Sequence, residues 1–300
     1  MITLCTNSEA KLITHSATSV LDLERIKARL QSTSNLTLSL DDTLKLLTQL
    51  TEFELGQFLL ENQGLNGYWT SYLILNGPKK NDLSELEYWI VHKAPVVKAT
   101  QERFRIFQRI IQNRLKSGMT LLSIPCGTMD DLITLDKTSV SNIQLVGIDL
   151  DPESIALAKL NALNNECTNT SFIKKNAWEL DTYETYDLIT SNGLNIYEAD
   201  DSKVIILYKN FFKALKPKGI LVTSFLPPPP SISKDSTWKN FDPQALKKQK
   251  AIFADIIQAK WQVFRTEAQT KNHLETAGFK VLDIIYDTQG MFPTIIAEKP

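Results

Sequence analysis

Residues that hold metals or cross-link a chain are scarce in this protein. Its 300 residues include three cysteines and three histidines. Cys5, Cys126 and Cys167 have none of the spacings typical of zinc sites, and three cysteines cannot all pair as disulfides. We therefore expect no metal site, and we expect reduced thiols of the kind that intracellular proteins carry.

Long apolar runs and an excess of one charge are missing as well. No run is long enough to span a bilayer, and the N-terminus lacks the basic and apolar regions of a signal peptide. The net charge is −1, which gives no bulk attraction for nucleic acid or anionic lipid. These absences predict a cytoplasmic protein without membrane contacts and argue against nucleic acid as a partner.

The composition is that of an ordinary globular protein, with 43% hydrophobic and 22% charged residues. Helical periodicity dominates residues 1–95, which are predicted to form an N-terminal helical cap or lid, although the first 18 or so show no period and read as a loose leader. Residues 96–300 alternate strand and helix signals and are predicted to form an α/β body. Within it, residues 226–265 follow a predicted strand and read as an insertion on the substrate side, with helices expected over 238–264.

The segment from Met119 to Leu160 predicts a strand, a tight turn, a helix, a second strand, an acidic turn and another helix. Gly127 lies in the first turn, and its lack of a Cβ lets a ligand approach the backbone. Asp149 ends the second strand, about 20 residues further on, where a carboxylate can accept hydrogen bonds from both hydroxyls of a ribose. The pattern therefore predicts a nucleoside at the carboxyl ends of parallel strands.

The turn around Gly127 does not suit a dinucleotide. It has one glycine instead of three, and Asp130 and Asp131 follow it, so negative charge would repel a pyrophosphate. A ligand that has a positive centre and no phosphate suits the turn better. S-adenosylmethionine is such a ligand.

On these residues the chain resembles the class I S-adenosylmethionine-dependent methyltransferases. The family's first motif is typically Asp/Glu-x-Gly-x-Gly-x-Gly. Here Ser123 stands at the position of the acid, only the central glycine is retained, as Gly127, and Pro125 and Met129 occupy the other glycine positions. The order and spacing of the later segments carry the resemblance. These segments are Val146–Glu153, Ser171–Ala177, Tyr186–Gly193 and Leu215–Val222.

The resemblance implies an α/β fold with a Rossmann-like seven-stranded sheet, mostly parallel, whose last strand is antiparallel. It implies S-adenosyl-L-methionine as the cofactor, with Asp149 as the ribose ligand. Arg103, on a helix just before the first strand, could hold the methionine carboxylate through a bidentate bond, or could belong to a solvated helix face. The other predicted cofactor-binding residues are Pro125, Cys126, Gly127, Leu150, Asn176, Ala177, Ser191 and Asn192.

Four residues are predicted to bind the methyl acceptor. Tyr68 and Trp69 could form an aromatic roof over the site, or a hydrophobic seam that joins the cap to the body. Asn195 and Tyr197 follow the predicted fourth strand, which faces the transferred methyl group in the family. His92 and His273 are general bases only by residue type, so no catalytic residue is assigned.

The sequence thus predicts a methyltransferase that acts on a small-molecule acceptor by in-line transfer, with the cap and the insertion enclosing the acceptor. One alternative is a degenerate protein that binds through the same fold without transfer, which the missing glycines suggest. Another is a protein or RNA methyltransferase. The absence of an Asn-Pro-Pro-Tyr type sequence and the near-neutral charge argue against that alternative.

Overall fold

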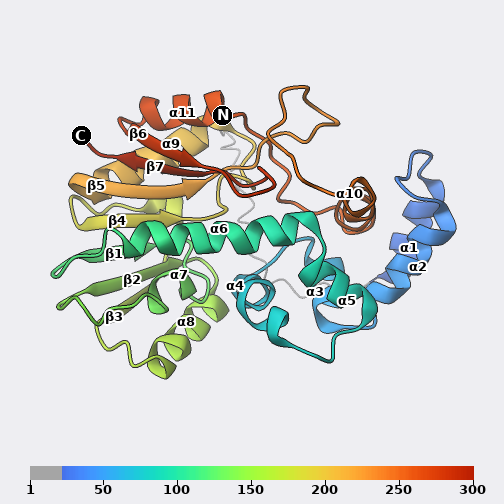
Figure 1. Ribbon diagram of the computed structural model, residues 1–300, viewed down its shortest axis with the longest axis horizontal. Coiled ribbons are helices and arrows are strands. Elements are labelled where there is room, and N and C mark those ends of the chain that lie inside the picture. Colours follow the sequence, from blue (N-terminus) through green and yellow to red (C-terminus); the bar gives the residue numbers. More distant parts are fainter. Residues whose placement is uncertain (1–21) are drawn as a thin grey trace, which may run out of the picture.

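The computed structural model describes residues 22–300 (Figure 1), so the expected leader lies outside the described residues. Seven strands form one sheet in the order β3-β2-β1-β4-β5-β7-β6. Strands β1 to β5 pair in parallel, whereas β7 is antiparallel to both β5 and β6. The predicted Rossmann-like sheet is confirmed. The strand bounds are β1 Thr120–Ser123, β2 Gln144–Asp149, β3 Thr170–Lys174, β4 Tyr186–Ser191, β5 Leu215–Ser224, β6 Lys280–Ile285 and β7 Thr294–Glu298.

Helices cover both faces of the sheet, because successive strand residues point to opposite sides. Leu121 and Leu188 are buried with α6, α7 and α8, whereas their neighbours Leu122 and Ile189 are buried with α9 and α11. Because the helices cover the two faces, the carboxyl ends of the parallel strands remain available to line a ligand site. The helix bounds are α6 Pro95–Gln112, α7 Asp130–Ile133, α8 Pro152–Asn164, α9 Asp201–Ala214 and α11 Glu267–Thr276.

The helices that precede α6 share one hydrophobic core with the segment that follows β5. Leu50, Leu59 and Ile90 are buried in the same cluster as Ile252 and Phe253. In Figure 1, α1, α2, α3, α5 and α10 gather beside the sheet, and α6 runs from this group along the sheet. The division at residue 95 stays a prediction. The bounds are α1 Leu23–Ser32, α2 Leu40–Leu50, α3 Glu54–Asn62, α4 Gly67–Ser71, α5 Glu85–His92 and α10 Pro243–Lys250, with π-helices at Tyr72–Asn76 and Ala251–Ile256 and 3₁₀-helices at Gly77–Lys79 and Ala177–Glu179.

Short polar side chains begin several of these helices. Ser39 accepts a hydrogen bond from the Asp42 N–H at the start of α2. Asp151 accepts hydrogen bonds from the N–H groups of Glu153 and Ser154 and so caps the start of α8. The expectation of helices throughout 238–264 is wrong at both ends, because only residues 243–256 are helical. Across residues 22–300, every helix is too short or too polar to traverse a bilayer.

Candidate active site

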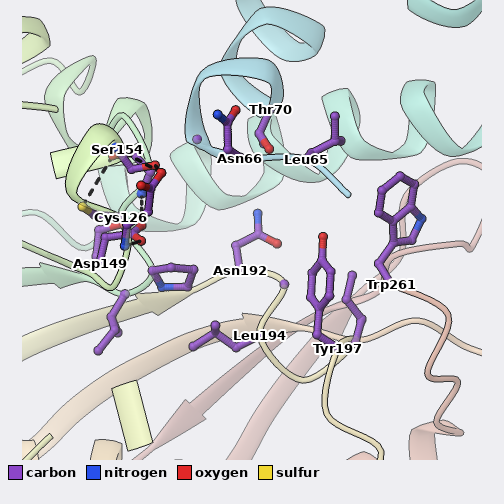
Figure 2. Close-up of a pocket in the computed structure, with 18 of the residues that line it drawn as sticks. Leu65, Asn66, Thr70, Cys126, Asp149, Ser154, Asn192, Leu194, Tyr197 and Trp261 are labelled. Carbon is purple, nitrogen blue, oxygen red and sulfur yellow. Dashed lines mark hydrogen bonds between the residues drawn. The ribbon is translucent and has the colours of Figure 1, made fainter. Parts of the chain in front are cut away.

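A cavity of about 640 Å³ lies at the carboxyl ends of the strands. Its wall combines the turn after β1, the end of β2, the loop after β4 and residues of α3, α4, α6 and the segment after α10. Figure 2 shows Asp149 and Cys126 on one side, Tyr197 and Trp261 on the other, and Asn192 between them. We call the first side, with Asp130, Asp131, Asp149 and Asp151, the acidic end. We call the second side, with Leu59, Tyr197, Phe253 and Trp261, the apolar end.

Asp149 links the two turns of the acidic end. Its Oδ2 accepts a hydrogen bond from the Gly127 N–H at 2.8 Å, and its Oδ1 accepts one from the Asp151 N–H at 3.0 Å. Gly127 has a φ of +51°, in the left-handed region where glycine is favoured. Burial raises the pKa of the Asp149 carboxyl. Since each carboxylate oxygen can accept more than one hydrogen bond, Asp149 can still receive a pair of ligand hydroxyls.

Asp131 is a second carboxylate on the cavity wall, and it is not among the predicted cofactor-binding residues. The Ser123 hydroxyl donates to it at 3.0 Å and the Thr190 hydroxyl at 2.6 Å. Burial raises the pKa of this carboxyl to about 6, against the effect of the two hydroxyl donors. The resemblance places an acid at the position of Ser123. Because the short α7 places Asp131 against Ser123 at the end of β1, this aspartate supplies a carboxylate there instead.

Helix α4 rests directly on the glycine turn. A Cβ on Gly67 would lie 2.7 Å from the Gly127 Cα and 2.8 Å from the Ser154 Oγ. The Asn66 side chain begins the helix by accepting a hydrogen bond from the Trp69 N–H at 3.0 Å. Asn66 and Thr70 line the cavity above Asn192 (Figure 2). The contact between two glycine backbones is what lets this helix lie so close to the turn.

Tyr68 and Trp69, predicted to bind the methyl acceptor, lie outside the cavity wall. Trp69 is buried between Tyr68 and Tyr72, with ring centroids 4.9 and 5.2 Å away, and Tyr68 is 43% exposed. The helical turn directs Gly67, Thr70 and Ser71 to the cavity instead. The position of Trp69 in the core of the cap matches the hydrophobic seam that was its alternative.

Two of the polar residues predicted at the end of β4 also lie outside the cavity wall. Ser191 is buried in β4 opposite Thr223 of β5. Asn195 is buried too, and its amide donates to the Tyr208 hydroxyl at 3.1 Å and to the Ser224 carbonyl at 2.9 Å. Asn195 therefore fastens the loop after β4 to α9 and to the end of β5. Asn192 and Tyr197, from the same segment, do line the cavity.

Leu150, Asn176 and Ala177, which are predicted to bind the cofactor, lie on the cavity wall, as do Pro125 and Cys126. Asn176 begins the 3₁₀-helix by accepting a hydrogen bond from the Trp178 N–H at 3.1 Å, so its amide has a local partner besides any ligand. Leu150 and Ala177 supply apolar surface beside it. Burial raises the pKa of the Cys126 thiol, which therefore stays protonated and unreactive at neutral pH.

Arg103 lies on the cavity wall and is 6% exposed, which rules out the solvated helix face that was its alternative. Its Nη1 donates to the Ser224 Oγ at 3.3 Å, and its guanidinium carbon lies 4.2 Å from the centre of the Phe292 ring. Its Nε is buried without a hydrogen-bond partner. Burial lowers the pKa of the guanidinium to about 10, so the group remains positively charged at neutral pH.

Arg265, which the sequence analysis did not consider, fixes the loop that carries Tyr197. It donates to the Asn195 carbonyl through Nη1 and to the Glu198 carbonyl through Nη2, both at 2.6 Å, and to Asp201 through Nε at 2.8 Å. His273 bonds the same Asp201 and lies outside the wall. Among the described residues, no histidine lines the cavity.

The chain resembles known proteins in sequence and in fold. Residues 115–278 match a family described as a methyltransferase domain. The chain belongs to the class I S-adenosylmethionine-dependent methyltransferases. A solved structure from Bordetella parapertussis, described as a possible exported protein, is 43% identical to this methyltransferase with a TM-score of 0.89, over 93% of this chain and 94% of that one. A S-adenosylmethionine-dependent methyltransferase from Aquifex aeolicus is 16% identical with a TM-score of 0.47, over 65% of this chain and 89% of that one. No functionally curated protein matches the chain.

The acidic end of the methyltransferase has the chemistry that the family's cofactor requires. The cavity wall carries five carboxylates and three cationic groups, and four of the carboxylates lie at the acidic end. An excess of negative charge favours a ligand with a sulfonium and an ammonium group over a phosphate-bearing one. The carboxylates are Asp130, Asp131, Asp149, Asp151 and Glu198, and the cations are Arg103, Lys175 and Lys203.

Proposed function

We propose that this methyltransferase transfers the methyl group of S-adenosylmethionine in line to a compact small-molecule acceptor. The observation that carries the proposal is one cavity with two chemically different ends, covered by α4 and by the segment after α10. Its volume of about 640 Å³ is typical of sites for small molecules. A cavity wall with more carboxylates than cations does not favour an RNA substrate.

In this proposal the acidic end holds the cofactor, which when bound supplies a methyl group on a positively charged sulfur. Asp149 accepts the ribose hydroxyls, and Asp131 pairs with the ammonium of the methionine part. Leu150, Asn176 and Ala177 contact the adenine. Asn192 orients the acceptor, and the apolar end binds its body and excludes water.

The test is transfer of labelled methyl groups from S-adenosylmethionine. The protein is incubated with three fractions of a cell extract, which contain small molecules, proteins and RNA. We expect label in the small-molecule fraction with the wild type and none with Asp149→Ala. Label in the protein or RNA fraction would overturn the proposed acceptor class. Binding of the cofactor without transfer to any fraction would favour the degenerate binding protein.

We also propose a cytoplasmic location. It is supported by Cys126 and Cys167, which are free thiols in the structure. The relative from Bordetella parapertussis is described as a possible exported protein, so the location of this protein has to be measured directly. Fractionation of cells that produce the tagged protein should recover it with a cytoplasmic marker. Recovery from the periplasm or the medium would contradict the proposal.

Asp131 gives a pH-dependent prediction. If its carboxylate pairs with the ammonium of the cofactor, protonation removes the attraction, so the affinity for S-adenosylhomocysteine should fall as the pH drops through about 6. Asp131→Asn should weaken binding about 10- to 100-fold at pH 7.5, the cost of one hydrogen bond to a charged group. It should also flatten the pH profile between 5 and 7. Calorimetry at several pH values measures both. An unchanged profile in the variant would show that another group titrates.

Gly67→Ala tests the close contact of α4 with the glycine turn. The new Cβ would meet the Gly127 backbone at 2.7 Å, so the helix must move away from the turn. We expect weaker S-adenosylhomocysteine binding, by about 10-fold, and a loss of about 1–3 kcal/mol of stability from overpacking. Calorimetry and denaturant unfolding measure the two effects. Tyr68→Phe, in the same helix, changes an exposed side chain outside the cavity wall, adds no atoms and serves as the control. Equal affinity of Gly67→Ala and the wild type would contradict the closed position of α4.

A further inference from the structure

We infer that the methyl acceptor is an apolar carboxylic acid whose carboxylate is bound by Arg103. This inference rests on the proposed function and names its substrate class. It starts from a buried cation whose hydrogen-bonding capacity is not filled. The Nε of Arg103 has no partner, its Nη1 contacts only the neutral Ser224 hydroxyl, and Arg103 has no ion pair within residues 22–300.

The buried carboxylate of Asp287 favours the charge on this guanidinium but makes no ion pair with it. Its two oxygens accept hydrogen bonds from the N–H groups of Gln289, Met291 and Phe292 instead. Asp287 therefore holds the turn between β6 and β7. A buried charge without a hydrogen-bonded ionised partner is costly, and Arg103 lines the cavity. An anion brought by a ligand offsets that cost.

The position of Arg103 favours the acceptor over the cofactor as the source of this anion. Arg103 is bonded to the last residue of β5, whereas Asp149 is the last residue of β2. Three strand spacings separate β2 from β5 in the sheet, or about 14 Å. Asp131, which pairs with the ammonium of the methionine part in the proposal, bonds Ser123 of β1 and Thr190 of β4. These two strands are two spacings and one spacing from β5, or about 10 and 5 Å. Tyr197 of the apolar end lies near Arg103.

The surroundings of Arg103 indicate the rest of the acceptor. The Phe292 ring covers one face of the guanidinium, and Phe253 and Trp261 line the same cavity with ring centroids 5.8 Å apart. A planar guanidinium binds a carboxylate through two parallel hydrogen bonds, and a single positive charge matches a single carboxylate better than a phosphate dianion. The acceptor is therefore a monocarboxylic acid with an apolar, preferably aromatic, body.

The test compares acids with their primary amides on the protein saturated with S-adenosylhomocysteine. The probes are acetate, benzoate and 3-phenylpropionate, each paired with its amide, and calorimetry or saturation-transfer NMR gives the affinities at pH 7.5. We expect the wild type to prefer at least one acid by 10-fold or more. Arg103→Met should bring acid and amide within twofold, with an unchanged affinity for S-adenosylhomocysteine. Arg105→Met, an exposed arginine on the same helix, should behave as the wild type.

Two outcomes would overturn the inference. One is the absence of any acid preference in the wild type, including no binding of any acid. The other is a 10-fold or larger loss of S-adenosylhomocysteine affinity in Arg103→Met, which would assign the guanidinium to the methionine carboxylate. Failure of the wild type to bind S-adenosylhomocysteine would count against the proposed function instead, and the acid preference would then be measured on the free protein.

Misfolding of Arg103→Met is checked separately. Its unfolding midpoint without ligand should equal or exceed that of the wild type, because methionine removes a buried charge and keeps apolar contact with Phe292. A preferred acid should raise the midpoint of the wild type and leave that of the variant unchanged. Equal shifts in the two proteins would contradict the inference.

Discussion

Asp149→Ala should weaken the binding of S-adenosylhomocysteine more than 100-fold. In the proposed site the carboxylate receives both ribose hydroxyls, and each hydrogen bond to a charged group contributes about 1.5–3 kcal/mol. The same substitution removes the acceptor of the Gly127 N–H at 2.8 Å, so the turn that faces the methionine part loses its tie to β2. Both effects lower the affinity for the ligand. Isothermal titration calorimetry measures the loss.

Two control variants separate ligand contact from damage to the turn. Asp149→Asn keeps an oxygen for the Gly127 N–H and removes the charge, so we expect an intermediate loss of about 10- to 100-fold. Glu153→Gln removes an exposed carboxylate from the first turn of α8 and should leave the affinity unchanged. Equal affinities in the wild type and Asp149→Asn would show that this carboxylate is not a ligand of the ribose.

Arg265→Met should destabilise the protein by about 2–5 kcal/mol, because the Asn195 and Glu198 carbonyls lose their donors inside the structure. The pair with Asp201 adds little to this figure, since the Asp201 side chain is 50% exposed. The affected loop carries Asn192 and Tyr197, so acceptor binding should suffer more than cofactor binding. Denaturant unfolding measures the stability, and calorimetry measures the affinity for S-adenosylhomocysteine.

The matched control for this loss is Arg105→Met, which truncates an exposed arginine and should change the stability by less than about 0.5 kcal/mol. Arg265→Lys keeps the charge but cannot serve three acceptors at once, so it should lie between the wild type and Arg265→Met. Equal unfolding free energies of Arg265→Met and the wild type would mean that the loop does not depend on this side chain.

The parts of the site that the sequence predicts lie at the ends of neighbouring strands, so they depend only on local sequence patterns and on the strand order. Gly127 follows β1 and Asp149 ends β2, and the two strands are neighbours in the sheet, so the hydrogen bond between these residues follows from the strand order. The alternation of buried residues along β1 and β4 likewise requires only that both faces of the sheet are covered. For these elements, local pattern and tertiary structure agree.

Other residues have positions that only tertiary packing determines. Trp69 lies in a helix of five residues, too short for a periodic pattern to show which side faces the cavity. Asp131 reaches the cavity because α7 is only four residues long. The direction of Arg103 depends on how α6 crosses the sheet, and Arg265 meets a loop 70 residues away in the chain. No spacing in the sequence encodes such contacts.

The most direct test of the cofactor site is a calorimetric titration of the wild type with S-adenosylmethionine and S-adenosylhomocysteine, repeated with Asp149→Ala. We expect each ligand to bind the wild type with low-micromolar affinity and one-to-one stoichiometry, and neither to bind the variant. Absence of binding to the wild type would contradict this expectation, because the acidic end would then not be a cofactor site. Equal binding to both proteins would place that site elsewhere in the molecule.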